Sequence, residues 1–89
     1  MKKKIAILGS TGSIGQSTLE VIRKDKKNFN IILLSANNNY KKLVEQAKQF
    51  KVKNVLIKNH KFYLNVKNSL KRTKTKVYSG DVSIKRIIS

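Results

Sequence analysis

The fold is decided by one stretch near the start of the chain, Ile5-Ala-Ile-Leu-Gly-Ser-Thr-Gly-Ser-Ile-Gly15. A short apolar run leads directly into three glycines, Gly9, Gly12 and Gly15, which are spaced three residues apart. A continuous apolar run of this length is typical of a buried parallel strand. Glycines between such a strand and a helix form the loop that cradles phosphates in dinucleotide-binding folds. The stretch therefore predicts a buried strand over residues 4–8, a phosphate-binding loop and a helix.

The rest of the sequence alternates between amphipathic segments and short apolar runs. Helical spacing of apolar residues is found over residues 13–24, 40–50, 60–70 and 82–88, the last with Asp81 placed to cap it. Runs typical of buried strands occupy residues 30–36, 54–57 and 76–79. This alternation predicts an α/β fold, a Rossmann-like parallel sheet with flanking helices. The sheet is expected to be incomplete, roughly the first half of a nucleotide-binding domain.

Composition limits what the chain can do. Its 89 residues allow one small domain at most, so we do not expect a self-sufficient enzyme. The net charge of +17 raises nucleic acid as a partner, but the basic residues are mostly lysines spread along the whole chain. Nucleic-acid binding usually concentrates arginine and aromatic residues, so the charge favours a compositional bias. The absence of cysteine excludes disulfides and thiolate chemistry.

The N-terminus carries no secretion or membrane signal. Lysines at positions 2–4 are followed by only five apolar or small residues before polar ones begin, too few for a signal peptide. No apolar stretch approaches the 18 residues of a membrane span. We therefore expect no membrane association and a cytoplasmic protein.

Each glycine of the loop has a separate expected task. Gly9 permits the tight turn, Gly12 lets the backbone approach a pyrophosphate, and Gly15 lets the helix lie close to the sheet. The backbone amides at the start of the helix would face the anion, aided by the hydroxyls of Ser10, Thr11 and Ser13. The alternative is an ordinary turn-forming cluster. A P-loop is excluded, because the required Gly-Lys-Ser/Thr is absent.

The end of the second predicted strand bears on the choice of cofactor. In NAD-binding folds an acidic residue at this place holds the ribose 2′-hydroxyl. Here the segment is Ser35-Ala-Asn-Asn-Asn39, which has no carboxylate, and Lys41 and Lys42 follow it. Asparagine amides can donate to a 2′-phosphate, whereas a carboxylate would repel it. The segment favours NADPH over NADH.

The longer string Ile7-Leu-Gly-Ser-Thr-Gly-Ser-Ile-Gly-Gln-Ser-Thr-Leu19 closely resembles the N-terminus of the 1-deoxy-D-xylulose 5-phosphate reductoisomerase family. The resemblance continues more loosely through Val44-Glu-Gln46 and the segment Val77-Tyr-Ser-Gly80. It implies an NADPH-dependent oxidoreductase and isomerase of non-mevalonate isoprenoid biosynthesis, which converts its phosphosugar substrate to 2-C-methyl-D-erythritol 4-phosphate. The resemblance also implies a homodimer and a Mg²⁺ or Mn²⁺ site in the full-length enzyme.

Carried over position by position, the resemblance assigns two groups of cofactor-binding residues. The first group matches the family's pyrophosphate loop and comprises Thr11, Gly12, Ser13 and Ile14. The second occupies the loop that meets the ribose phosphate and comprises Asn37, Asn38 and Asn39. Asn39 matches the family, whereas Asn37 and Asn38 replace the Gly-Lys that some members carry. Residues 1–89 are thus expected to form part of the NADPH-binding domain.

The catalytic machinery is expected to lie outside this chain. Its four acidic residues are scattered, so no carboxylate cluster for a metal is predicted, and no catalytic residue is assigned. The lone histidine, His60, is interpreted as a surface residue, and the chain alone is expected to be inactive. Two alternatives stay open: an atypical short-chain or semialdehyde dehydrogenase, which also carries a G-x-T-G-x-x-G loop, and a small basic nucleic-acid-binding module.

Overall fold

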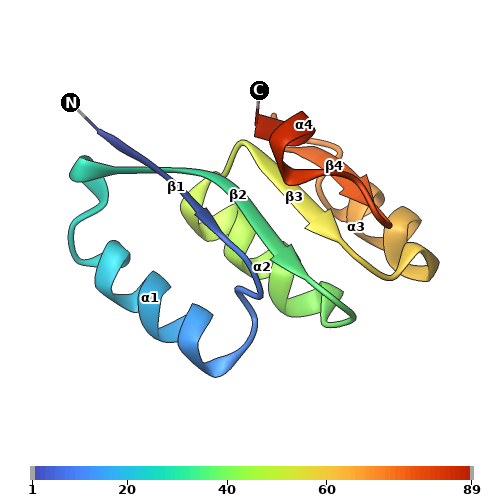
Figure 1. Ribbon diagram of the computed structural model, residues 1–89, viewed down its shortest axis with the longest axis horizontal. Helices are drawn as coiled ribbons and strands as arrows, with labels where there is room; N and C mark the ends of the chain where they lie inside the picture. The colour runs from blue at the N-terminus through green and yellow to red at the C-terminus, as the bar shows by residue number, and fades with distance from the viewer. Residues whose placement is uncertain (1, 89) are drawn as a thin grey trace.

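The chain forms a four-stranded parallel sheet in a computed structural model that describes residues 2–88. The strands are β1 (Lys3–Ile7), β2 (Phe29–Ala36), β3 (Asn54–Ile57) and β4 (Lys76–Ser79). They lie in the order β1-β2-β3-β4, so each strand pairs with the next one along the chain (Figure 1). Parallel neighbours need a crossover connection, and a helical segment supplies each of the three.

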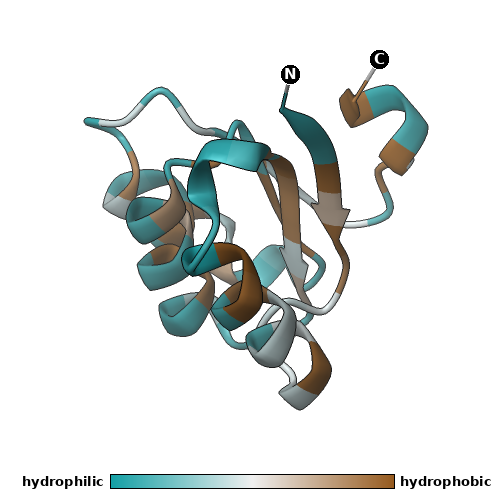
Figure 2. Ribbon diagram, turned by 90° about the vertical axis from the view of Figure 1, so that its left-hand side faces the viewer, coloured by the Kyte–Doolittle hydropathy of each residue, from teal (hydrophilic) through white to brown (hydrophobic). Residues whose placement is uncertain are grey.

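The helices cover the two faces of the sheet unequally. They are α1 (Ser13–Arg23), α2 (Tyr40–Phe50), α3 (Tyr63–Ser69) and α4 (Ile84–Ile88), with short 3₁₀ turns η1 (Lys26–Asn28) and η2 (His60–Phe62). The first three lie on one face, and α4 lies alone on the other (Figures 1 and 2). The predicted α/β fold class, a Rossmann-like parallel sheet with flanking helices, is confirmed.

The core follows the alternation of side chains along the strands. In β3, Val55 and Ile57 are fully buried against α1, α2 and α3, whereas Leu56 joins the small cluster beneath α4. Figure 2 shows the apolar colour along much of the strands and in bands that alternate with polar residues on the helices, although Ile14, Val21 and Leu64 are large apolar helix residues that remain exposed. Burial on both faces explains why β3 is a continuous apolar run.

A β-bulge changes the faces of β2. Ile5 pairs with Ile31 but Ala6 pairs with Leu33, so Ile32 is an extra residue on β2. Without the bulge Ile31 and Leu33 would point to one face, because strand side chains alternate. Instead Ile31 packs against the three helices and Leu33 packs beneath α4. The bulge lets β2 supply both clusters.

The prediction of a fully buried first strand is wrong. Within β1 only Ile7 is buried, while Lys3, Lys4 and Ala6 are exposed, and Leu8 just after the strand is 56% exposed. The physical reason is position, because β1 has a neighbour on one side only and α4 packs over β2 and β3. An apolar run shows that a strand can be buried on both faces. It does not show that other elements cover both faces.

Two helix boundaries also differ from expectation. The segment predicted as one helix over residues 60–70 begins as the 3₁₀ turn η2, because the Asn59 side chain accepts from the Lys61 N–H and caps a tight turn. The last helix begins at Ile84, and the Ile87 N–H donates to the Ser83 carbonyl at 3.1 Å. The predicted cap at Asp81 is therefore wrong, since the helix starts beyond its reach.

Candidate functional site

The glycine-rich loop lies at the carboxyl edge of the sheet, between β1 and α1. Gly9 has a φ of +70°, a left-handed conformation that favours glycine, and its carbonyl accepts the Gly12 N–H at 3.1 Å. A Cβ built on Gly15 would lie 2.5 Å from the Gly9 carbonyl oxygen. The tight turn expected at Gly9 and the close helix approach expected at Gly15 are both present.

Gly12 has a different environment from Gly15. A Cβ at Gly12 would meet only the Gly9 carbonyl oxygen, at 3.5 Å, an ordinary van der Waals distance. The protein itself therefore has room for a small side chain there. Gly12 is exposed, so the backbone here is sterically open to the close approach that the pyrophosphate hypothesis requires.

The first turn of α1 presents unpaired backbone amides. Gly12 is the N-cap and supplies no capping side chain, and the Gln16 N–H is the helix amide that donates to the Gly12 carbonyl, at 2.9 Å. The preceding amides of Ser13, Ile14 and Gly15 have no intrahelical acceptor. Together with the helix dipole they form an environment that favours an anion. The Ile14 side chain, 85% exposed, borders it.

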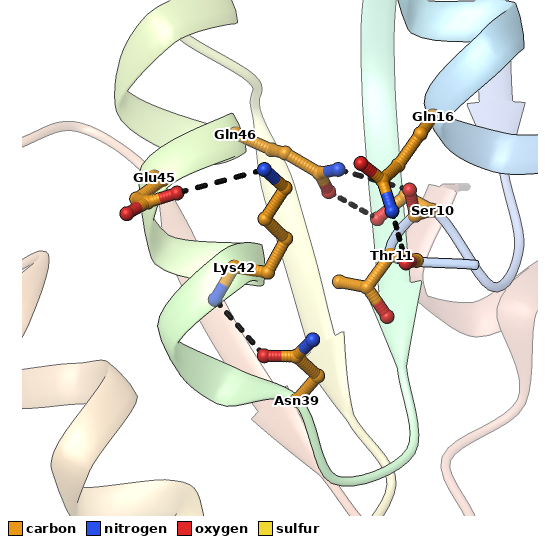
Figure 3. A network of polar contacts seen from close by, with 7 residues as sticks. All are labelled: Ser10, Thr11, Gln16, Asn39, Lys42, Glu45 and Gln46. Carbon is orange, nitrogen blue, oxygen red and sulfur yellow. Dashed lines mark hydrogen bonds and ion pairs between the residues drawn. The ribbon is translucent and has the colours of Figure 1, made fainter. Parts of the chain in front are cut away.

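A buried polar cluster fastens the loop to β2 and α2. The Ser10 hydroxyl donates to Oε1 of Gln46 at 2.7 Å, and Nε2 of Gln46 donates to the Ser10 carbonyl at 2.9 Å (Figure 3). The Ser10 N–H donates to the Ser35 carbonyl at 2.8 Å, and the Gly9 N–H donates to the Ser35 hydroxyl at 3.1 Å. Ser10 is fully buried, and Gln46 is 5% exposed.

This cluster overturns one expectation and adds one residue. The Ser10 hydroxyl was expected to face an anion, but it points inward to Gln46, because a buried hydroxyl needs a partner. Sequence reasoning did not assign Gln46 to the site, because the apolar stripe of the 40–50 segment does not include it. The only available signal was its place on the helix beside Leu43 and Phe50 of that stripe.

Thr11 and Ser13 keep their places beside the open part of the loop. The Thr11 carbonyl accepts from Nε2 of Gln16 at 2.8 Å, which ties the middle of the loop to the first turn of α1 (Figure 3). The Thr11 side chain is half-buried and Ser13 is exposed. Thr11, Gly12, Ser13 and Ile14 thus form one continuous surface around the helix start.

The three asparagines lie at the same edge of the sheet, directly after β2, and all are exposed. Asn37 lines a hollow of about 520 Å³ together with Leu8, Gly9 and Lys58 from the ends of neighbouring strands, and residues 82–84 also line it. The structure therefore brings Asn37 beside the glycine loop. Asn38 and Asn39 lie outside the lining of this hollow.

Asn39 begins α2. Its Oδ1 accepts the Lys42 N–H at 3.2 Å, the capping geometry in which an asparagine satisfies an orphan helix amide (Figure 3). The same helix carries Gln46 two turns later. We call residues Asn37, Asn38 and Asn39 the asparagine loop. The first residues of α2 thus adjoin the asparagine loop, and Gln46 in the middle of α2 contacts the glycine loop.

Removal of this cap gives a measurable effect. Asn39→Ala should lower the free energy of unfolding by about 1 kcal/mol, because the Lys42 N–H loses its acceptor. Thermal unfolding followed by circular dichroism measures the change, with Asn39→Ser, which retains a capping oxygen, as the control. Equal stability of the two variants would contradict the capping role.

The acidic residues and the histidine are the other candidates for a metal or catalytic site. Within residues 2–88 no three His, Cys, Asp or Glu side chains gather closely enough to hold a metal ion. His60 is exposed, its Nδ1 lies 2.6 Å from the Ser79 hydroxyl and its ring stacks on Tyr63.

Arg23 donates to Glu20 and lowers the pKa of that carboxyl, but both side chains are exposed, so the pair contributes little to stability.

The membrane prediction can be compared with the helices. Among residues 2–88, no helix combines the length and apolar composition needed to cross a bilayer.

Comparison with known proteins places the chain in a family. The family model of 1-deoxy-D-xylulose 5-phosphate reductoisomerase matches residues 5–89. The reductoisomerase of Pelagibacter ubique is 49% identical over 87 residues, which make up 98% of this chain and 22% of the relative. That of Phocaeicola vulgatus is 44% identical over 88 residues, 99% of this chain and 23% of the relative. The chain thus spans less than a quarter of the length of these relatives.

Solved structures agree in fold. The reductoisomerase from Zymomonas mobilis in complex with NADPH matches 90% of this chain and 21% of its own, with a TM-score of 0.88 and 32% identity. A reductoisomerase in complex with NADPH, fosmidomycin and magnesium matches 89% of this chain and 20% of its own, with a TM-score of 0.83 and 31% identity. These matches decide against the short-chain and semialdehyde dehydrogenase alternatives. The chain belongs to the 1-deoxy-D-xylulose 5-phosphate reductoisomerase family.

Proposed function

We propose that residues 1–89 form part of the NADPH-binding domain of an enzyme that converts 1-deoxy-D-xylulose 5-phosphate to 2-C-methyl-D-erythritol 4-phosphate. The observation that carries the proposal is the glycine loop at the carboxyl edge of the sheet, whose unpaired helix amides favour an anion. The likeness to a reductoisomerase in complex with NADPH supports the same site. The chain alone, without a reaction centre in residues 2–88, is proposed to be inactive.

In this proposal two surfaces of the chain hold NADPH. Thr11, Gly12, Ser13 and Ile14 surround its pyrophosphate, for which the open side of Gly12 leaves space. Asn37, Asn38 and Asn39 meet the ribose 2′-phosphate, where no carboxylate repels it. NADPH, when bound, supplies the hydride for a reduction. The chain's own contribution is to bind and orient the cofactor.

The described residues do not fit the metal of the proposed full-length enzyme. Divalent cations such as Mg²⁺ and Mn²⁺ need clustered oxygen ligands, and residues 2–88 offer no cluster of acidic side chains. We propose that the metal, the phosphosugar substrate and the catalytic groups belong to the part of such an enzyme beyond the present 89 residues. A homodimer and a cytoplasmic location complete the proposal and are supported by the family alone.

The test is a titration of the 89-residue chain with NADPH and with NADH. Tighter binding of NADPH is expected, and Gly12→Val should weaken it at least roughly tenfold, because the side chain would occupy the space of the pyrophosphate. Intrinsic fluorescence or calorimetry measures the dissociation constants. Ser17→Val, on the exposed side of α1, is the matched control and should leave them unchanged. Unchanged NADPH affinity in Gly12→Val would overturn the assignment of this loop.

A further inference from the structure

The asparagine loop presents side-chain amides, and the function of an amide depends on which end points outward. An outward oxygen accepts hydrogen bonds and suits a ribose hydroxyl, whereas an outward NH₂ group donates them and suits a phosphate. The orientation is fixed wherever a neighbouring backbone N–H, which can only donate, engages the oxygen. Two amides are fixed in this way, that of Asn59 beside the asparagine loop and that of Asn39 within it, and each is called a fixed point below.

The first fixed point lies after β3. The Lys61 N–H donates to Oδ1 of Asn59 at 3.0 Å, so the NH₂ end of Asn59 is the end left for other partners. It donates to Oδ1 of Asn38 at 2.8 Å. The Asn59 N–H also donates to the Asn37 carbonyl at 3.0 Å, so Asn59 holds the loop at two points. This chain of bonds turns the NH₂ end of Asn38 away from Asn59.

The second fixed point is the start of α2. The Lys42 N–H engages Oδ1 of Asn39, which leaves the NH₂ end of Asn39 pointing away from the helix (Figure 3). Within residues 2–88 neither Nδ2 of Asn38 nor Nδ2 of Asn39 donates to another protein group. Each amide oxygen therefore already accepts one hydrogen bond, whereas both NH₂ groups remain available as donors.

We propose that Asn59 is a specificity-determining residue that selects the 2′-phosphate of NADPH over the 2′-hydroxyl of NADH. It does so as a positioning residue, by holding Asn38 with its NH₂ group toward the ligand. Asn38 and Asn39 then direct donor groups toward the ligand, which suits a phosphate better than a ribose diol that is normally held by a carboxylate. The inference rests on the proposed NADPH site and adds to it the residue that sets the preference.

The test compares NADPH and NADH dissociation constants of the 89-residue chain by calorimetry. In Asn59→Asp the carboxylate still accepts the Lys61 N–H but cannot donate to Asn38, which is expected to rotate and turn its oxygen outward. NADPH affinity should fall roughly tenfold, the equivalent of one hydrogen bond to a charged group, while NADH affinity changes little. Asn59→Ser keeps a cap for η2 but is too short to reach Asn38, and it should lower the preference by less.

Asn59→Ser, which removes the donor to Asn38 without adding a charge, separates orientation from local electrostatics, and Asn30→Asp controls for net charge. Asn30→Asp adds the same charge near the start of β2, roughly 20 Å from the loop along the strand, and should leave the preference unchanged. If the unmodified chain shows no preference for NADPH, the proposed function fails and this inference with it. If it prefers NADPH and both Asn59 variants keep the preference, only this inference is overturned. An equal loss of both cofactors would show a purely structural role for Asn59 and would also overturn it.

Discussion

Replacing Gly15 with alanine is expected to lower the free energy of unfolding by about 2 to 3 kcal/mol, even though alanine is the better helix former by about 1 kcal/mol. The added Cβ would lie 2.5 Å from the Gly9 carbonyl oxygen and 2.6 Å from Cα of Ser10. Both are backbone atoms, so the loop or α1 must shift as a unit. Urea denaturation followed by circular dichroism measures the loss.

Gly12→Ala is the matched control for this prediction. Its Cβ would meet the Gly9 carbonyl oxygen at 3.5 Å, so stability should stay within about 0.5 kcal/mol of the unmodified chain. The two substitutions add the same methyl group three residues apart in the same loop. A Gly15→Ala variant as stable as Gly12→Ala would refute the close packing of α1 on the loop.

The second large effect is expected at Gln46. Gln46→Ala removes both hydrogen bonds between Ser10 and α2, which leaves the buried Ser10 hydroxyl with only its longer contact to the Ser35 carbonyl, at 3.4 Å, and takes the Gln46 donor from the Ser10 carbonyl. Each buried polar group left without a partner costs about 1 to 3 kcal/mol, so a loss of about 3 kcal/mol is expected. Thermal unfolding reports the change. Hydrogen exchange at the Ser10 amide, which donates to Ser35, should accelerate as the loop loosens.

Gln49→Ala tests whether this effect comes from the buried position. Gln49 lies on the exposed side of the same helix, so its removal should change stability by less than about 0.5 kcal/mol. The double variant with Ser10→Ala should lose less than the sum of the two single variants, because the hydroxyl that needs Gln46 is already gone. Strictly additive losses would count against a direct bond between the two side chains.

The stretch from Ile5 to Gly15 was informative because its requirements are local. Gly9 adopts a left-handed conformation, and Gly15 lies in close contact with a neighbouring part of the same loop. The residue types in this one stretch and their order were therefore enough to predict both features. The β3 and β4 boundaries also matched their apolar runs. The α-helix predicted to begin at residue 60 begins only at Tyr63, because the Asn59 side chain caps a 3₁₀ turn in front of it. Helical spacing does not reveal such a turn.

Long-range contacts could not be predicted in the same way. Ser10 and Gln46 are 36 residues apart in the sequence, and only the packing of α2 against the loop brings them together. The orientation of Asn38 likewise depends on Asn59, which comes 21 residues later on a different strand end. Neither pair leaves a periodic signal, since each involves single polar residues on separate elements.

The sequence by itself determined the order of the elements, the parallel sheet and the tight conformation of the glycine loop, because short-range sterics and side-chain periodicity control all three. The tertiary structure alone decided which polar groups face inward and which remain exposed. It turned the Ser10 hydroxyl toward Gln46, left β1 exposed at the edge of the sheet and oriented the asparagine amides. These outcomes depend on which elements become neighbours, and that is settled only when the chain packs.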